Sequence, residues 1–434
     1  MENQSFKRSV VRRSNNLTSS RDILRFLQAT HQQDLPHEVM QYIFSMLPMA
    51  YVFLYKFVCQ GWRKSICEPE MARLHFLHSR DNPRTTSLLL YSVVRSKSSG
   101  VEDISLRIIP YADKCDHAFE LTNLQFIKSF LPKFKIMGSC HGLVCVADDS
   151  CTYSKIRIFN PVTGHCYLCP ESNLGRQGKV INGKFFGFGY DPNLKLYKVV
   201  RIREVVSGGR MVGMAIELHI LGTGCWETYK FPKKYMMLSG PRGRTHGVFF
   251  RGVFLWLCIT ENSSVMYIGA FYTEMGEEHL FRAFELPQPI IGRNCYQVYF
   301  GELDGIFSVA YDGNPSEKYM DVWQLQENGH WLIGYKIPKP DPCSLCKSIA
   351  RVQPLGIDMN GNILFNVRCC VHRGFYSYNP KNDTLLEFRT NGLPTCYAAF
   401  PLTPTFFPLK EAIYCSVMEE IHKRDHRRIT ACNQ

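Results

Sequence analysis

Long hydrophobic stretches are missing from this 434-residue chain. The longest apolar run, residues 46–59, is broken by Pro48 and Lys56 and falls short of the roughly 20 residues that a membrane helix needs. The N-terminus also lacks the apolar core of a signal peptide, because it is interrupted by four basic residues, Lys7, Arg8, Arg12 and Arg13. We therefore expect a soluble intracellular protein that does not act on a membrane.

Cysteine is too infrequent in this chain for a disulfide scaffold. The 18 cysteines make up about 4% of the residues, well below the disulfide scaffolds of short secreted proteins, so reduced thiols are expected. Cys166 and Cys169 have the spacing of metal ligands. A Cys₃His zinc site would form if two loops met, from Cys343, Cys346, Cys369 and His372. Nothing else in the sequence requires zinc, and we predict no metal site.

Motifs for nucleotide binding and nucleophilic catalysis are missing as well. Residues 187–189 lack the third glycine and the following helix of a dinucleotide site, and residues 208–209 precede no Lys-Ser or Lys-Thr pair. Cys140 and His141 are adjacent, so their side chains diverge along a strand and make a poor nucleophile–base pair. We therefore expect no cofactor and no catalytic site.

Acidic residues are outnumbered, which leaves a net charge of +13. The surplus is spread over both tails and the loop 241–244, and no helix carries a basic stripe with interleaved aromatics. This favours an acidic partner over direct binding to nucleic acid. Residues 1–33 are predicted to be disordered, with one short helix over 21–28 allowed. Their Arg and Ser bias also resembles a transit peptide or a nuclear-import patch; we expect the nucleus, the cytoplasm or both.

Residues 34–80 are predicted to be helical. Asp34 is the expected N-cap, with Pro36 in the first turn. Apolar residues then recur at three- and four-residue steps, as in an amphipathic helix: Val39, Met40, Ile43, Phe44 and Leu47. Pro48 ends this helix, and a second stripe spans residues 52–62. The resulting trio of helices is small, and burying an apolar face against a partner would stabilise it.

From about residue 88 the pattern changes to short strands separated by Gly, Asn, Asp and Pro. The expected strands include 88–94, 142–146, 155–159, 198–202, 216–221, 253–258, 320–325 and 363–367. Related segments, each a glycine-containing turn before an apolar strand, begin near residues 138, 187, 247, 303 and 358. Their step of about fifty residues is the size of a four-stranded kelch-like propeller blade.

The predicted fold class is therefore mainly β with a small N-terminal α domain. Strands near 88–94 and 104–110 would complete the ring by pairing with a C-terminal strand near 397–401, which protects the sheet edges. Six blades fit best, and five or seven also fit. The expected domains are a disordered basic segment, a helical domain, a kelch-like propeller and a polar basic tail, at 1–33, 34–80, 81–410 and 411–434.

Several segments resemble a known family. LPHEVMQYIFSMLP at 35–48, VCQGWR at 58–63 and ICEP at 66–69 resemble an F-box. GSCHGL at 138–143 and FGFGYDP at 186–192 are similar to the F-box-associated, kelch-related domain of plant proteins. The resemblance implies a non-catalytic subunit of a Skp–cullin–F-box ubiquitin ligase, in which the F-box docks on a Skp-family adaptor held by a cullin–RING core. The second domain would then capture the protein to be ubiquitinated and degraded.

Carried over by position, the resemblance implies nine adaptor-facing residues: Leu35, Pro36, Val39, Ile43, Leu47, Pro48, Val58, Cys59 and Trp62. An apolar helical face that meets partner helices is a common mode of recognition. The same residues also suit the core of the helical trio itself. The segment 49–55 departs from the family pattern because it is more aromatic.

Substrate contacts are expected on the long loops 203–214, 234–246 and 339–347. The second loop holds four candidate residues for an acidic or phosphorylated partner: Lys234, Arg242, Arg244 and His246. Two other functions are considered: a propeller enzyme of another class, and a scaffold or transcriptional co-regulator that uses the F-box without degradation. The identity of the substrate does not follow from the sequence.

Overall fold

The computed structural model describes residues 35–47, 49–80, 87–95, 102–110, 119–120, 134–148, 155–172, 174, 180–207, 210–237, 247–260, 263–273, 280–290, 298–311, 317–339, 351–358, 360–368, 373–388, 398–406, 408–410 and 413. The predictions for the N-terminal 33 residues and for nearly all of the C-terminal tail lie outside these residues. The chain divides into two compact units, one formed by residues 1–82 with 405–407 and the other by 83–404 with 408–434.

The first unit, which we call the helical unit, contains α3 (His37–Ser45), α4 (Met49–Tyr55), α5 (Gln60–Cys67) and α6 (Pro69–Arg80). Helix α3 packs against both α5 and α6. Its N-cap is Pro36, which makes no side-chain capping bond, and the predicted cap Asp34 lies outside the described residues. No helix among the described residues is long and apolar enough to cross a membrane.

Within the described part of residues 34–80, four helices are found where three were expected. The predicted second stripe, 52–62, is divided because residues 56–58 form a turn between α4 and α5. Cys59 then takes an extended conformation, with φ −156° and ψ 167°, and its Sγ accepts a hydrogen bond from the Trp62 N–H at 3.4 Å. This N-cap begins a new helix where the apolar periodicity alone runs on without a break.

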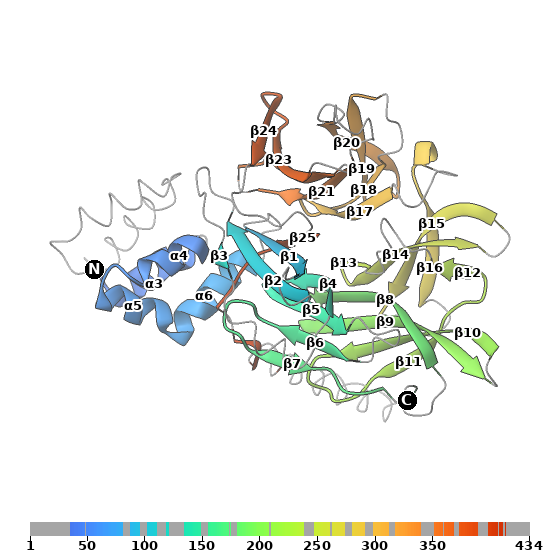
Figure 1. The fold of residues 1–434 in the computed structure, drawn as a ribbon, viewed down its shortest axis with the longest axis horizontal. Helices are drawn as coiled ribbons and strands as arrows, with labels where there is room; N and C mark the ends of the chain where they lie inside the picture. The colour runs from blue at the N-terminus through green and yellow to red at the C-terminus, as the bar shows by residue number, and fades with distance from the viewer. Residues whose placement is uncertain are drawn as a thin grey trace, which may run out of the picture. The chain divides into compact units, whose positions relative to one another are not determined.

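The second unit is a β-propeller of six four-stranded or five-stranded sheets, numbered here as blades (Figure 1). Blades 1 to 3 contain these strands: β25 (Ala398–Leu402), β1 (Ser87–Arg95), β2 (Glu102–Pro110) and β3 (Phe119–Glu120); β4 (Phe134–Cys140), β5 (Leu143–Asp148), β6 (Ile156–Phe159) and β7 (Cys166–Leu168); β8 (Val180–Asp191), β9 (Leu196–Ser207), β10 (Arg210–Ile220) and β11 (Glu227–Lys230).

Blades 4 to 6 follow in chain order. Their strands are β12 (Tyr235–Met237), β13 (Val248–Phe250), β14 (Val253–Thr260), β15 (Ser263–Tyr272) and β16 (Phe281–Glu285); β17 (Val298–Leu303), β18 (Ile306–Tyr311), β19 (Tyr319–Leu325) and β20 (Trp331–Pro338); β21 (Arg351–Ile357), β22 (Ile363–Arg368), β23 (Arg373–Asn379) and β24 (Thr384–Phe388). In blade 4 both β12 and β13 pair with β14. A short 3₁₀ helix, Gln288–Ile290, follows β16.

The ring is closed by the two ends of the propeller sequence. β25 pairs antiparallel with β1, with Leu89 opposite Phe400, so the last strand completes the first blade. The first strands of successive blades are neighbours all the way round: β25 contacts β4, and contacts then run through β8, β13, β17 and β21 back to β25. The six-bladed architecture and its N-terminal to C-terminal closure confirm the interpretation of the fifty-residue repeat.

Two kinds of turn explain the residue pattern that recurs in the sequence. The connections β4–β5, β13–β14 and β17–β18 are two-residue turns at 141–142, 251–252 and 304–305, and both residues of each have positive φ. This is the signature of type I′ hairpins, whose second position favours glycine. The Asn-Pro turns end the third strand of blades 2 and 6, where the side-chain oxygens of Asn160 and Asn379 accept backbone N–H bonds at 2.8 and 2.9 Å.

Apolar clusters join neighbouring blades. One contains Phe134 and Leu106 from blades 2 and 1, and another contains Trp256 and Phe185 from blades 4 and 3. Similar clusters connect blades 4 with 5, 5 with 6 and 6 with 1. Because this burial lies between the blades, the sheets that share a cluster stabilise one another.

Candidate functional site

The helical unit has its own apolar core, built from all four helices. Phe44, Met49, Tyr55, Ile66 and Met71 are among its members, and each is at most 4% exposed. Trp62 lies edge-on to two of these rings, 5.2 Å from the centroid of Phe44 and 5.6 Å from that of Tyr55. These contacts fix α4 and α5 against α3.

A polar cluster fixes the N-terminal turn of α3. The Nε2 of His37 donates to Glu68 Oε2 at 2.6 Å, because a carboxylate can only accept, and Gln41 Nε2 donates to the same oxygen at 2.6 Å. His37 Nδ1 also lies 3.1 Å from Ser65 Oγ. In the absence of a side-chain cap on Pro36, these bonds tie the first turn of α3 to α5 and to the start of α6.

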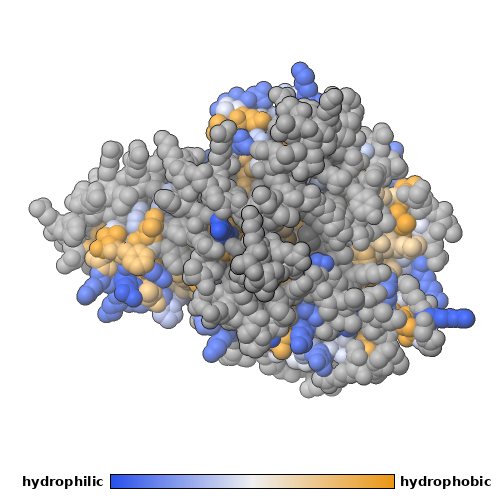
Figure 2. Space-filling model, in the orientation of Figure 1, coloured by the Kyte–Doolittle hydropathy of each residue, from blue (hydrophilic) through white to orange (hydrophobic). Residues whose placement is uncertain are grey.

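Next to this packed core lies an unusually exposed apolar surface, here called the apolar patch and formed by Leu54, Phe57 and Val58. These side chains are 49%, 85% and 57% exposed. Their spacing of three and four residues places them side by side at the end of α4 and in the following turn. Figure 2 shows apolar surface, in orange, over the helical unit. A phenylalanine that remains this exposed marks a surface suited to a protein partner.

Three of the residues predicted to face the adaptor are buried within the helical unit. Val39, Ile43 and Leu47 are 8%, 5% and 3% exposed, because the apolar stripe of α3 faces α5 and α6. At this degree of burial they offer little area to a partner. Pro48, which belonged to the same set, lies outside the described residues.

The remaining predicted residues stay accessible to different degrees. Leu35, Pro36 and Trp62 are half-buried, and Leu35 and Trp62 both pack against the pair formed by Val39 and Ile43. Val58 is itself a member of the apolar patch, and Cys59, the next residue in the chain, is also exposed.

The residues named from the sequence do not include Leu54 and Phe57, the other two members of the apolar patch. Buried Val52 and Tyr55 lie on the inner face of α4, so residues two and five positions beyond Val52 fall outside it. The sequence shows this division into buried and exposed positions only when the end of α4 at Tyr55 is given. The aromatic character of segment 49–55, noted as a departure from the family pattern, belongs to this same helix.

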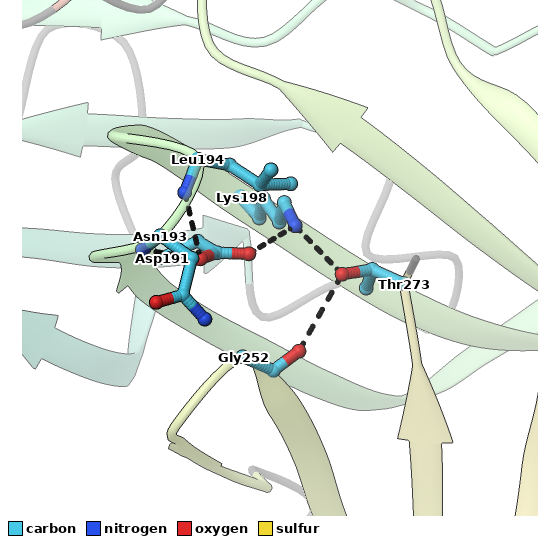
Figure 3. Close-up of polar contacts among 6 residues, drawn as sticks. All are labelled: Asp191, Asn193, Leu194, Lys198, Gly252 and Thr273. Carbon is cyan, nitrogen blue, oxygen red and sulfur yellow. Dashed lines mark hydrogen bonds and ion pairs between the residues drawn. The ribbon is translucent and has the colours of Figure 1, made fainter. Parts of the chain in front are cut away.

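In the propeller, the FGFGYDP motif connects blades 3 and 4. Asp191 accepts backbone N–H bonds from Asn193 and Leu194 through Oδ1, and Lys198 Nζ donates to its Oδ2 at 2.6 Å (Figure 3). Lys198 also donates to Thr273 Oγ1 at 2.6 Å, and that hydroxyl donates to the Gly252 carbonyl at 3.4 Å. The acidic residue of the motif therefore serves packing between blades, with both charges fully buried.

A second buried ionic cluster lies along β9 and β10. Arg201 Nε donates to Glu217 Oε2 at 2.6 Å, while Arg203 Nη1 lies 3.6 Å from the same oxygen. The Arg201 guanidinium also stacks on Trp226, 4.3 Å from the ring centroid. Burial, followed by the nearby Arg201 charge, lowers the pKa of Arg203. Removing only Glu217 would leave two buried cations without their counter-ion, so these residues specify the fold of blade 3.

Two described thiols of the propeller, Cys140 and Cys169, are poor candidates for a nucleophile or a metal ligand. Burial raises the pKa of Cys140 to about 12, and the neighbouring His141 directs Nδ1 towards Tyr197 Oη at 3.3 Å. Burial also raises the pKa of Cys169 to about 12. A thiol that stays protonated is neither a nucleophile nor a metal ligand.

Metal-binding clusters of three or more His, Cys, Asp or Glu side chains do not occur within the described part of the chain. The zinc set considered from the sequence, Cys343, Cys346, Cys369 and His372, lies outside it.

The predicted substrate loops have different outcomes. Residues 203–214, expected to be a loop, are mostly the ends of the long paired strands β9 and β10, with Arg210 opposite Ser207. Within this segment Val205 and Val206 lie in β9 and pair with β10, opposite Gly213 and Met211, so the hairpin extends where a loop was expected. Lys234 is exposed in the turn between β11 and β12. Its three partners in the prediction, Arg242, Arg244 and His246, and most of loop 339–347 lie outside the described residues.

Comparisons with known proteins agree with this two-part architecture. A family model described as the F-box associated beta propeller domain matches residues 73–400, and one described as the F-box domain matches residues 33–73. The F-box/kelch-repeat protein At3g23880 of Arabidopsis thaliana is 27% identical over 306 residues, covering 68% of this chain and 76% of that protein. The F-box protein At3g07870 of the same plant is 28% identical over 408 residues, covering 84% and 89%.

Among solved structures, TolB from Acinetobacter baumannii covers 76% of this chain and 69% of its own at 11% identity, with a TM-score of 0.39. This likeness is too distant to add to the assignment. A helical unit with an exposed apolar patch, followed by a closed six-bladed propeller, defines an F-box protein of the plant type. The chain belongs to the family that carries the F-box associated beta propeller domain.

Proposed function

We propose that this protein is the substrate-recognition subunit of a Skp–cullin–F-box ubiquitin ligase. The helical unit docks on a Skp-family adaptor, which is held by a cullin and RING core. The propeller binds a protein that is then ubiquitinated and degraded. In this role the chain catalyses nothing itself, and the names of its Arabidopsis relatives are those of F-box proteins.

The observation that carries the proposal is the apolar patch of the helical unit. Phe57 is 85% exposed although buried aromatic residues lie close to it in the chain. Burying one such side chain at an interface stabilises the complex by about 1.5–3 kcal/mol, and aromatic residues dominate the energetics of many interfaces. A partner that offers an apolar groove between helices would bury Leu54, Phe57 and Val58 together.

For the substrate side, we propose an acidic or phosphorylated surface as the partner. Lys230, Lys233 and Lys234 are exposed on the connection from β11 to β12. In the sequence these three lysines precede Arg242, Arg244 and His246, the other members of the predicted site. The net charge of +13 supports the same sign of partner. Lysine and arginine together bind phosphate groups through charge-assisted hydrogen bonds.

The experiment that tests both halves is affinity purification of the full chain from plant cells, read by mass spectrometry. Two variants address the two sites. We expect Phe57→Asp with Val58→Asp to lose the Skp-family adaptor and the cullin while other partners are retained. Lys230→Glu, Lys233→Glu and Lys234→Glu together should keep the adaptor and lose a subset of partners. That subset contains the substrate, and its half-life should lengthen in cells that express the charge variant.

Matched surface changes elsewhere control for general effects. Leu386, 61% exposed on β24, is an apolar residue of blade 6 and Leu386→Asp should change neither set of partners. If the wild-type chain recovers no Skp-family protein, or the patch variant recovers it in equal amount, the proposed function is wrong. Equal recovery of all partners by the charge variant would exclude the basic surface as the substrate site.

A further inference from the structure

The chain that follows the last propeller strand has an unexpected environment. β25 ends at Leu402, and residues 403–406 have no regular secondary structure. Thr405 is nevertheless 1% exposed. Irregular segments normally run over the surface, so a buried one must pack against other elements. Residues 405–407 belong to the helical unit, although they follow its last helix by more than 320 residues in the sequence.

The packing partner of this segment is the core of the helical unit. Phe406 is half-buried and packs against the cluster that contains Phe44, Met49, Val52 and Tyr55. The Nζ of Lys56 lies 4.1 Å from the centroid of the Phe406 ring. At this distance the ammonium interacts favourably with the face of the ring, and the interaction strengthens as the pair is desolvated. Burial is the largest influence on Lys56 and lowers its pKa.

This contact lies directly beside the apolar patch in the sequence and in the structure. Lys56 stands between Leu54 and Phe57, at the end of α4. A helix of seven residues such as α4 is not stable by its own hydrogen bonds and needs packing on more than one side. The core covers one side of α4, and Phe406 supplies a contact at its C-terminal end. Prolines at 404 and 408 flank the segment and reduce the conformational freedom that docking removes.

We infer that residues 405–406 are a working part of the F-box: Phe406 is a positioning residue that holds α4 and Lys56 so that the apolar patch is presented to the adaptor. The residues lie outside both matched regions, 33–73 and 73–400. The inference rests on the proposed function for the identity of the partner, and its structural half stands on the contacts of Phe406 alone. An F-box delimited at residue 80 would lack this element.

The test uses the full chain with three substitutions of Phe406. Hydrogen exchange of the α4 amides reports the structural half without any adaptor, and titration with a Skp-family adaptor reports the functional half. We expect Phe406→Ala to speed exchange in α4 and residues 56–58 about tenfold and to weaken adaptor binding about five- to tenfold. Phe406→Tyr keeps the ring over Lys56 and should restore both. Phe406→Leu keeps apolar bulk without the ring, so it should be intermediate.

Phe400→Ala is the matched control, because Phe400 is a half-buried phenylalanine of β25 that packs into the propeller core. It should leave α4 exchange and adaptor affinity unchanged. Unchanged exchange in α4 for Phe406→Ala would overturn the inference, as would faster exchange with wild-type affinity. If the wild-type chain does not bind the adaptor, the proposed function fails, and the exchange data still decide whether Phe406 holds α4.

Discussion

At the scale of single residues, two buried histidines lie in surroundings that keep them neutral. His219 on β10 donates from Nδ1 to the Cys225 carbonyl at 2.7 Å, and Tyr167 Oη lies 3.0 Å from its Nε2. Burial, with the nearby Arg201 charge, lowers the pKa of His219 to about 4. Burial also lowers the pKa of His75 in α6 to about 4, where Nε2 donates to the Leu47 carbonyl.

These values predict that the protein loses stability in mild acid. The folded state keeps His219 neutral down to about pH 4, whereas the unfolded chain takes up a proton near the ordinary pKa of 6.5. The stabilising contribution is therefore complete above pH 6.5 and is lost as pH falls from 6.5 towards 4. From the shift in pKa, His219 should account for a loss of about 2 kcal/mol between pH 7 and pH 5.

Urea unfolding of the propeller at pH 7 and pH 5 measures this loss. The variant His219→Gln removes the titrating group, so it should be less stable than wild type at pH 7 but should lose about 2 kcal/mol less on acidification. His75 is present in both proteins and cancels from the comparison. An equal acid loss in wild type and variant would show that His219 is not the group responsible.

At the scale of elements, the inner strands approach one another most closely where glycine replaces a side chain. In β8, a Cβ on Gly189 would clash with the ring of Phe249 in β13, and one on Gly187 would clash with Phe254 in β14. The alternating glycines of the FGFGYDP motif thus allow blade 4 to pack onto the inner strand of blade 3. The motif is explained by the geometry of this blade-to-blade contact.

Gly189→Ala is therefore predicted to destabilise the propeller by about 1–3 kcal/mol, because the added methyl group forces Phe249 out of its position. Gly301, in the inner strand β17 of blade 5, has no atom within 4 Å of the place a Cβ would occupy. The control Gly301→Ala should change stability by less than about 0.5 kcal/mol. Thermal unfolding of the two variants beside wild type gives the comparison, and equal melting temperatures would contradict the packing account.

At the scale of the whole molecule, the fold followed from two regularities of the sequence. Glycine-containing turns at fifty-residue steps predicted the blades, and the strand-like segment near 397–401 predicted the closure with β1. Both are local patterns with a direct structural meaning. The sequence predicts a loop over residues 203–214, but most of this segment pairs within the hairpin of β9 and β10. The strength of that pairing depends on neighbouring strands that local pattern does not show.

The adaptor-facing residues stay a prediction, because periodicity identifies an apolar face without saying what covers it. Ile43 and Leu47 lie on the predicted stripe and are buried by the other helices, whereas Phe57 lies off the predicted stripe of residues 52–62 and is exposed. The contribution of Phe406 was out of reach, because a contact across some 350 residues leaves no periodic signal. Features that depend on packing between residues far apart in the sequence were therefore not predicted.

The central claim is that the exposed apolar patch binds a Skp-family adaptor, and calorimetric titration of the purified full chain tests it most directly. We predict that wild type binds with one-to-one stoichiometry and that Phe57→Asp weakens the affinity about tenfold or more, since a buried aromatic contact is replaced by a charge. Leu386→Asp should bind as wild type does. No binding by the wild-type chain, or equal affinities for wild type and Phe57→Asp, would contradict the account.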